Sequence, residues 1–179
     1  MSQKINKNII LTGFMATGKT TIGQLIAKEL CLKFIDTDEE IVSRQGLSIP
    51  DIFSRFGENA FRVMETEIAD ELAGREGLVI STGGRMMLDP TNVDLLTKTG
   101  HVFCLTATAD EILNRVAKDG GTRPLLAVPD PKGKILELLE ERKKGYQRFE
   151  KVSTSNRKPA EIAQDVIKLF KTTQSKPLS

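Results

Sequence analysis

The chain has 179 residues, which is enough for one well-formed hydrophobic core and short for two domains that each fold independently. Hydrophobic residues make up 39% of the chain and charged residues 28%, so the long apolar runs that membrane insertion requires are missing. Basic and acidic residues nearly balance at a net charge of +2, with no basic tract typical of nucleic-acid-binding tails. We therefore expect one domain spanning 1–179, without nucleic-acid or membrane partners.

The cysteines and the chain ends carry little functional information. Cys31 and Cys104 match neither metal-ligand nor redox spacing, which favours reduced structural thiols over a disulfide. Residues 1–4 lack the apolar segment of a signal peptide, so we expect a cytoplasmic protein. The polar residues from about 173 to 179 are expected to fray.

Short apolar runs alternate with longer amphipathic stretches, which is typical of an α/β fold. The predicted strands cover residues 8–12, 33–35, 78–81, 101–105 and 152–154. The predicted helices cover residues 20–30, 39–45, 51–56, 59–73, 91–98, 109–118, 133–149 and 159–172. Pro90 and Pro159 fit the first turn of a helix, where a missing N–H removes no intrahelical bond. Five strands with intervening helices predict a parallel sheet.

Glycines and prolines interrupt this alternation between residues 119 and 131. Such a composition favours a mobile excursion between two helices. In an enzyme that uses ATP, a segment of this kind can serve as a lid.

A phosphate-binding pattern, G-x-x-x-x-G-K-T, occupies residues 13–20. Glycines at 13 and 18 allow backbone N–H groups to turn toward phosphate oxygens without obstruction by side chains. Lys19 would then reach the β- and γ-phosphates, and the Thr20 hydroxyl would bind Mg²⁺. An apolar strand precedes the loop and an amphipathic helix follows it, so we expect ATP and Mg²⁺ to bind. The loop alone does not distinguish a kinase from an ATPase, a GTPase or a regulatory switch.

Two carboxylates, Asp36 and Asp38, follow the second predicted strand. Strand alternation would place both on one side of the strand end, facing the phosphate loop. One could hold Mg²⁺ through water, and the other could accept a hydrogen bond from an attacking hydroxyl. The alternative is that Asp38 only caps the next helix.

The order and spacing of these features resemble the shikimate kinase family, in the nucleoside-monophosphate-kinase-like branch of P-loop enzymes. The residues that carry the resemblance are 13–20, Asp36-Thr37-Asp38, Phe61-Arg62 with Glu65, Ser81-Thr82-Gly83-Gly84, Arg123-Pro124-Leu125-Leu126, and Arg142 with Tyr146. The resemblance implies a three-layer P-loop NTPase fold, a five-stranded parallel sheet, a substrate-binding region at about 37–65 and a lid at about 119–131. It also implies transfer of the ATP γ-phosphate to the 3-hydroxyl of shikimate, a step in aromatic amino-acid biosynthesis.

The resemblance also assigns roles to individual residues. For the acceptor it implies Asp38, Arg62, Gly83, Gly84 and Arg142. For ATP it implies Gly13, Ala16, Thr17, Gly18, Lys19, Thr20, Thr21, Arg115, Arg123 and Arg157, and for Mg²⁺ it implies Thr20 and, through water, Asp36. The catalytic residues would be Lys19, Asp38 and Arg123. Arg115 and Arg157 would stack on adenine. A monomer is expected by analogy.

Several assignments keep an alternative. Arg62 could be a surface charge paired with Glu58 or Glu65, and Arg142 could belong to a solvated charged run. Two positions depart from the family pattern: Ala16 and Arg85 each stand where relatives usually carry glycine. Arg85 could point outward, or inward to favour another anionic acceptor. The alternative functions are therefore a kinase for another hydroxy acid, such as gluconate, and a catalytically weak ATP-binding sensor.

Overall fold

The computed structural model describes residues 7–118 and 124–174. Its strands are β1 (Asn8–Gly13), β2 (Lys33–Asp36), β3 (Leu78–Ser81), β4 (Gly100–Thr106) and β5 (Glu150–Ser153). Its helices are α1 (Lys19–Leu30), α2 (Thr37–Gln45), α3 (Ile49–Ala73), α4 (Pro90–Thr97), α5 (Ala109–Lys118), α6 (Pro131–Gln147) and α7 (Pro159–Gln174), with 3-10 helices η1 (Met86–Leu88) and η2 (Pro124–Leu126). The strands form one sheet in the order β2-β3-β1-β4-β5, and each described pair is parallel, as predicted.

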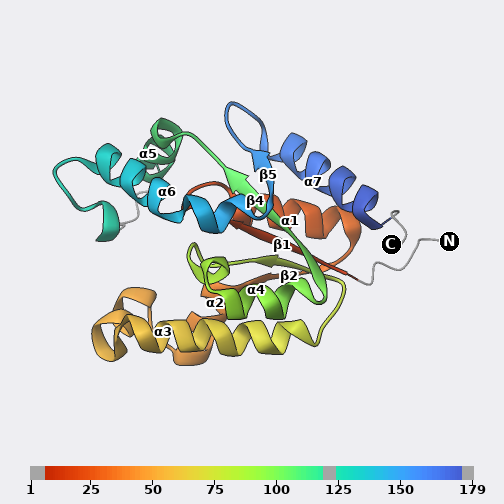
Figure 1. Ribbon diagram of the computed structural model, residues 1–179, viewed down its shortest axis with the longest axis horizontal. Helices are drawn as coiled ribbons and strands as arrows, with labels where there is room; N and C mark the ends of the chain where they lie inside the picture. Colours follow the sequence, from red (N-terminus) through yellow and green to blue (C-terminus); the bar gives the residue numbers. More distant parts are fainter. Residues whose placement is uncertain (1–6, 119–123, 175–179) are drawn as a thin grey trace.

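The central strand β1 is buried on both faces because its apolar side chains alternate between two cores. Ile9 and Leu11 pack in the core that includes α1 and α7, whereas Ile10 packs in the core that includes α3 and α4. Figure 1 shows the same arrangement, with α1 and α7 on one side of the sheet and α3 and α4 on the other. The expected three layers are therefore present.

Element boundaries differ from the sequence predictions where capping residues decide them. Helix α2 begins at Thr37 because the carboxylate of Asp36 accepts hydrogen bonds from the first turn. The two helices predicted for 51–56 and 59–73 belong to one element, α3, with a break at Gly57, where φ is 81° and ψ is 170°. Asp130 caps α6, which starts and ends two residues earlier than predicted. Among the helices described, none is long and apolar enough to cross a membrane.

Part of the proposed lid packs against the phosphate loop. Residues 119–123 lie outside the described part of the chain, so the predicted site residue Arg123 does as well. Leu126 in η2 is buried in a third core with Phe14 of the loop, Ile112 of α5 and Ile135 of α6. This core joins the helices on both sides of the excursion to the loop that follows β1.

The buried side chain of Asn8 ties together the segments that begin three neighbouring strands. Its amide nitrogen donates to the Arg75 carbonyl oxygen at 2.7 Å and to the Thr99 hydroxyl at 3.2 Å. Its amide oxygen accepts from the backbone N–H of Leu78 at 2.9 Å. Since β3 and β4 both flank β1, this one side chain helps to set the register of the central sheet.

We predict that Asn8→Ala lowers the free energy of unfolding by about 2 to 4 kcal/mol, because buried backbone groups would lose their partner. Urea unfolding followed by circular dichroism measures the change. Lys7→Ala, at the exposed neighbouring position, is the control. A loss below about 0.5 kcal/mol, the range of ordinary surface substitutions, would contradict this role for Asn8.

Candidate active site

The phosphate loop leaves β1 at the point where the strand order reverses. The chain passes from β1 to the β2 side of the sheet and later crosses to the β4 side, so β1 lies between the two halves. In parallel sheets, ligands bind outside the carboxyl ends of the strands at such a reversal. The predicted residues 13–20, Asp36 and Asp38, and Gly83 and Gly84 lie at or just after the ends of β1, β2 and β3, at this same edge. The predicted Arg62 and Arg142 come instead from α3 and α6.

The backbone of the phosphate loop requires glycine at its first position. Gly13 has a φ of 134°, and a Cβ atom there would lie 2.3 Å from the carbonyl oxygen of Leu105. Ala16 also has positive φ, at 57°, a conformation that costs an L-residue about 1 kcal/mol and that glycine adopts freely. Lys19 Nζ donates to the carbonyl oxygens of Gly13 and Phe14, each at 2.9 Å. The Lys19 ammonium group therefore binds the backbone at the start of the phosphate loop.

A hydroxyl and a carboxylate meet beside this loop. Thr20 Oγ1 donates to Asp36 Oδ2 at 2.9 Å, while Asp36 Oδ1 accepts from the backbone N–H of Asp38 at 3.1 Å. Such oxygen donors suit Mg²⁺, which usually takes few protein ligands and keeps water and phosphate oxygens. Within the described residues there is no cluster of three or more acidic, histidine or cysteine side chains that could hold a metal by itself. The donor set thus fits a metal that arrives with phosphate.

Asp38 reaches the site by a different route from the one predicted. It lies in the first turn of α2 and not on a strand, and Asp36, rather than Asp38, caps that helix. The carboxylates of Asp38 and Glu65 converge on Gly83: a Cβ atom at Gly83 would lie 2.6 Å from Asp38 Oδ1 and 2.8 Å from Glu65 Oε1. The Thr37 hydroxyl accepts from the Gly83 backbone N–H at 2.9 Å. Glycine is needed at position 83 for this close approach.

Glu65 is a buried carboxyl group, with 1% of its surface exposed. Its Oε2 atom accepts from Arg62 Nη1 at 2.6 Å, and its Oε1 atom has no hydrogen-bond partner among the described residues. Burial raises the pKa of Glu65 to about 7, the positive charge of Arg62 opposes the rise, and the negative charge of Asp38 adds to it. Glu65 therefore changes its protonation near neutral pH.

Arg142 does not belong to a solvated surface run, because only 5% of its surface is exposed. Its guanidinium carbon lies 5.1 Å from the ring centroid of Phe14, and Nε has no hydrogen-bond partner within the described chain. A Cβ atom on Gly84 would lie 3.8 Å from Nη1 of Arg142 and 3.9 Å from the Gly13 carbonyl oxygen. A buried cation with an unsatisfied donor is costly, which suits a site that receives an anion.

Tyr146 lies one turn after Arg142 on the same face of α6. Its hydroxyl donates to the Gly84 carbonyl oxygen at 2.5 Å, and burial raises its pKa to about 12. The Tyr146 hydroxyl therefore stays protonated and holds the glycine segment, Gly83 and Gly84, against α6. The sequence alone gave Tyr146 no role of its own beyond the resemblance.

Arg62 makes both ion pairs that its alternative interpretation named. Its Nε and Nη2 donate to Glu58 Oε1 at 3.3 and 2.9 Å, in addition to its bond to Glu65. Arg85 points toward α3, where its Nη1 lies 3.2 Å from the same oxygen of Glu58. Arg62 thus lies beside Glu65, and Arg85 is joined to Arg62 through the carboxylate of Glu58.

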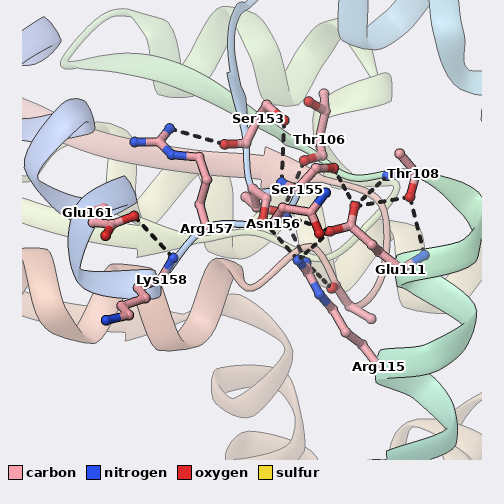
Figure 2. Close-up of polar contacts among 12 residues, drawn as sticks. Thr106, Thr108, Glu111, Arg115, Ser153, Ser155, Asn156, Arg157, Lys158 and Glu161 are labelled. Carbon is pink, nitrogen blue, oxygen red and sulfur yellow. Dashed lines mark hydrogen bonds and ion pairs between the residues drawn. The ribbon is translucent and has the colours of Figure 1, made fainter.

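On the opposite side of the loop, Arg115 joins the phosphate loop to the segment after β5 (Figure 2). It donates to the Ala16 carbonyl oxygen at 3.1 Å and to the hydroxyl and carbonyl oxygens of Thr154, each at 3.0 Å. These bonds engage the edge of the guanidinium plane. Arg157, in contrast, points away from Arg115 in Figure 2 and pairs with Asp165 at 2.6 Å. The structure does not bring Arg157 to the loop.

Glu111 is a further polar anchor that sequence reasoning missed. Its carboxylate accepts from the hydroxyl of Ser155 and, at 2.8 Å, from the backbone N–H of Asn156 (Figure 2). The Ser155 bond and the backbone bonds lower the pKa of Glu111 to about 2. The Thr108-x-x-Glu111 spacing is that of a capping box, and both reciprocal bonds form, at 3.2 and 3.3 Å. This signal could have located the residue, but not its contact with the segment after β5.

Comparisons with known proteins agree on one family. The sequence model of the shikimate kinase family matches residues 15–171. A shikimate kinase of Caldicellulosiruptor bescii is 42% identical over 171 residues, covering 95% of this chain and 99% of that protein. One from Thermus thermophilus is 42% identical over 170 residues, covering 94% and 92%.

Solved structures show the same likeness in three dimensions. Shikimate kinase from Acinetobacter baumannii in complex with shikimate has a TM-score of 0.87 at 35% identity, with 95% of this chain and 96% of that one covered. A gluconokinase from Sinorhizobium meliloti has a TM-score of 0.59 at 21% identity, covering 97% and 100%, and shares the fold alone. Because the family model matches residues 15–171 and the sequence match to a curated relative spans nearly the whole length of both chains, this chain belongs to the shikimate kinase family, a family of ATP-dependent kinases.

Proposed function

We propose that this chain transfers the γ-phosphate of ATP to the 3-hydroxyl of shikimate, giving shikimate 3-phosphate and ADP in aromatic amino-acid biosynthesis. The observation that carries the proposal is the position of Gly83 and Gly84. One lies against the carboxylates of Asp38 and Glu65, and the other lies between Arg142 and the first residue of the phosphate loop. Groups suited to a hydroxyl, a carboxylate and a phosphate therefore meet at one short segment.

Arg62 and Arg142 would bind the acceptor's carboxylate. Two planar guanidinium groups can hold a carboxylate through paired hydrogen bonds and so fix its orientation, which a lysine point charge does less well. Arg142 is already buried with Nε unsatisfied, so an anion would supply what the folded chain lacks. Orientation of the hydroxyl toward phosphorus is most of what this reaction needs from the protein.

Asp38 would accept a hydrogen bond from the attacking hydroxyl and orient it. Lys19 would exchange the carbonyl oxygens of Gly13 and Phe14 for phosphate oxygens when the nucleotide binds. Thr20 and Asp36 would hold Mg²⁺, which neutralises charge on the phosphates. Arg115 would offer a planar face to adenine, because its edge is fixed by carbonyl oxygens. Roles for Arg123 and Arg157 remain predictions.

The deciding experiment measures ADP release from MgATP with purified protein and shikimate, gluconate or no acceptor. We expect turnover that depends on shikimate, with gluconate at the level of the control without acceptor. Absence of shikimate-dependent turnover, in protein shown to be folded and to bind ATP, would contradict the proposal. ATP binding with little ADP release under all three conditions would instead favour the catalytically weak ATP-binding sensor.

Arg142→Lys keeps a positive charge but removes the guanidinium fork. We expect the KM for shikimate to rise by about tenfold to a hundredfold, since a hydrogen bond to a charged group contributes about 1.5 to 3 kcal/mol. The KM for ATP should change less than about twofold. Arg148→Lys, at the exposed end of the same helix, is the matched control. Equal changes in both KM values for Arg142→Lys would argue against an acceptor contact.

The raised pKa of Glu65 makes the stability of the fold depend on pH. In the proposed site, protonated Glu65 carries no negative charge beside Asp38. Ionisation of Glu65 therefore costs free energy, because it places two negative charges close together. Its folded pKa of about 7 lies above the ordinary value of 4.5, so between these values the folded chain binds more protons than the unfolded chain. The contribution of Glu65 to stability is therefore full below about pH 4.5 and declines as the pH rises through 7.

We expect the difference in unfolding free energy between wild type and Glu65→Gln to fall by about 1 to 3 kcal/mol between pH 5 and pH 8. Urea unfolding at four pH values measures it. Glu67→Gln, which removes an exposed carboxylate from the same helix, controls for loss of a surface charge. A difference that stays constant or grows with pH would show that Glu65 is not held in its neutral form.

A further inference from the structure

One carboxylate oxygen on α3 is shared by two arginines. Oε1 of Glu58 accepts from Nε and Nη2 of Arg62 at 3.3 and 2.9 Å and from Nη1 of Arg85 at 3.2 Å. The two arginines come from distant parts of the chain, since Arg62 lies in α3 and Arg85 precedes η1 after β3. Glu58 therefore links α3 to the residue that directly follows Gly83 and Gly84.

The contact matters because of which atoms of Arg62 it occupies. Arg62 uses Nη1 for Glu65 and uses Nε and Nη2, one edge of its guanidinium plane, for Glu58. That edge is one of the two that can bind a carboxylate through parallel bonds. An anionic acceptor and Glu58 would therefore compete for the same donors of Arg62.

Arg85 is a second positively charged partner of Glu58. With its charge close by, Glu58 can loosen its bonds to Arg62 without becoming an unpaired carboxylate. The charge of Arg85 also reaches further into the site. It helps Arg62 to oppose the rise in the pKa of Glu65 that burial causes, and, with Arg142, it opposes the same effect at Tyr146. The pair is half exposed, with 45% of the Arg85 side chain accessible, so its influence is moderate.

We propose that Arg85 is a positioning residue for the acceptor: it retains Glu58 so that the Nε and Nη2 edge of Arg62 becomes available to the acceptor's carboxylate. The inference rests on the proposed function, because it assumes that Arg62 binds that carboxylate. Arg85 contacts Glu58 and not the reacting groups. It acts on acceptor binding and leaves the phosphate-transfer step unchanged.

A double-mutant cycle with Arg85→Met and Glu58→Gln tests the inference. Arg85→Met removes the charge and keeps much of the side-chain stem, and we expect the KM for shikimate to rise by about threefold to tenfold. The kcat and the KM for ATP should change less than about twofold. In Glu58→Gln, which removes the competing charge, adding Arg85→Met should change the KM for shikimate less than about twofold.

Arg44→Met is the matched control. Like Arg85, Arg44 is a half-exposed arginine in an ion pair with a carboxylate of α3, with 39% of its side chain accessible. Its partners are Glu71 of α3 and Glu40 of α2. Glu71 lies about 20 Å further along α3 than Glu58, by the rise of 1.5 Å per residue. We expect Arg44→Met to leave the KM for shikimate unchanged. Thermal unfolding of each variant confirms that it is folded.

Each outcome decides the inference. An Arg85→Met effect that disappears in the Glu58→Gln background supports it. An effect of equal size in both backgrounds shows that Arg85 acts on the acceptor directly and overturns it, as does an effect below twofold or a parallel loss of kcat. If wild type does not turn over shikimate, the proposed function fails and the inference fails with it. If wild type is active and the cycle shows no coupling, the inference alone fails.

Discussion

The absence of a side chain at Gly83 allows three elements to converge at the carboxyl end of β3. A single added carbon there would lie within 3 Å of oxygen atoms of both Asp38 and Glu65. Carbon and oxygen atoms do not approach so closely without a bond, so any other residue at this position would push the carboxylate groups of Asp38 and Glu65 away from it. The hydrogen bond from the Gly83 N–H to Thr37 closes the same contact through the backbone. The convergence of α2 and α3 on the end of β3 depends on this approach.

Two ionisable side chains near Gly83 and Gly84, Arg142 and Glu65, are buried at a cost to the stability of the fold. Burial of Arg142 and of Glu65 is costly because each loses water without gaining a full set of partners. The chain limits the cost because the raised pKa of Glu65, about 7, lets this carboxyl group keep its proton up to near neutral pH, and because the Phe14 ring lies beside the Arg142 guanidinium. What remains unsatisfied is a set of donors and acceptors that a small polar anion could complete.

Side chains of α5 organise the phosphate loop and the segment after β5. Arg115 bonds to the phosphate loop and to Thr154, while Glu111 bonds to the two residues that follow Thr154 (Figure 2). Because both side chains come from one helix, the loop and the segment after β5 are held at a fixed separation. The third core, in which Phe14 packs against α5 and α6, holds that helix against the same loop.

Sequence by itself determined the parallel sheet, the phosphate loop and the family, because alternating apolar runs and glycine spacing are local properties of the chain. It also named Asp38 from its place after the second strand, and Arg62 and Arg142 only through resemblance. Its account of Asp38 was wrong in geometry, because the Asp36 cap starts α2 one residue after the strand. Tertiary structure decided what depends on contacts between distant segments: the burial of Arg142, the pKa of Glu65, the anchoring by Glu111 and the direction of Arg85. Those properties follow from which helices pack at the sheet edge, and no local pattern contains that information.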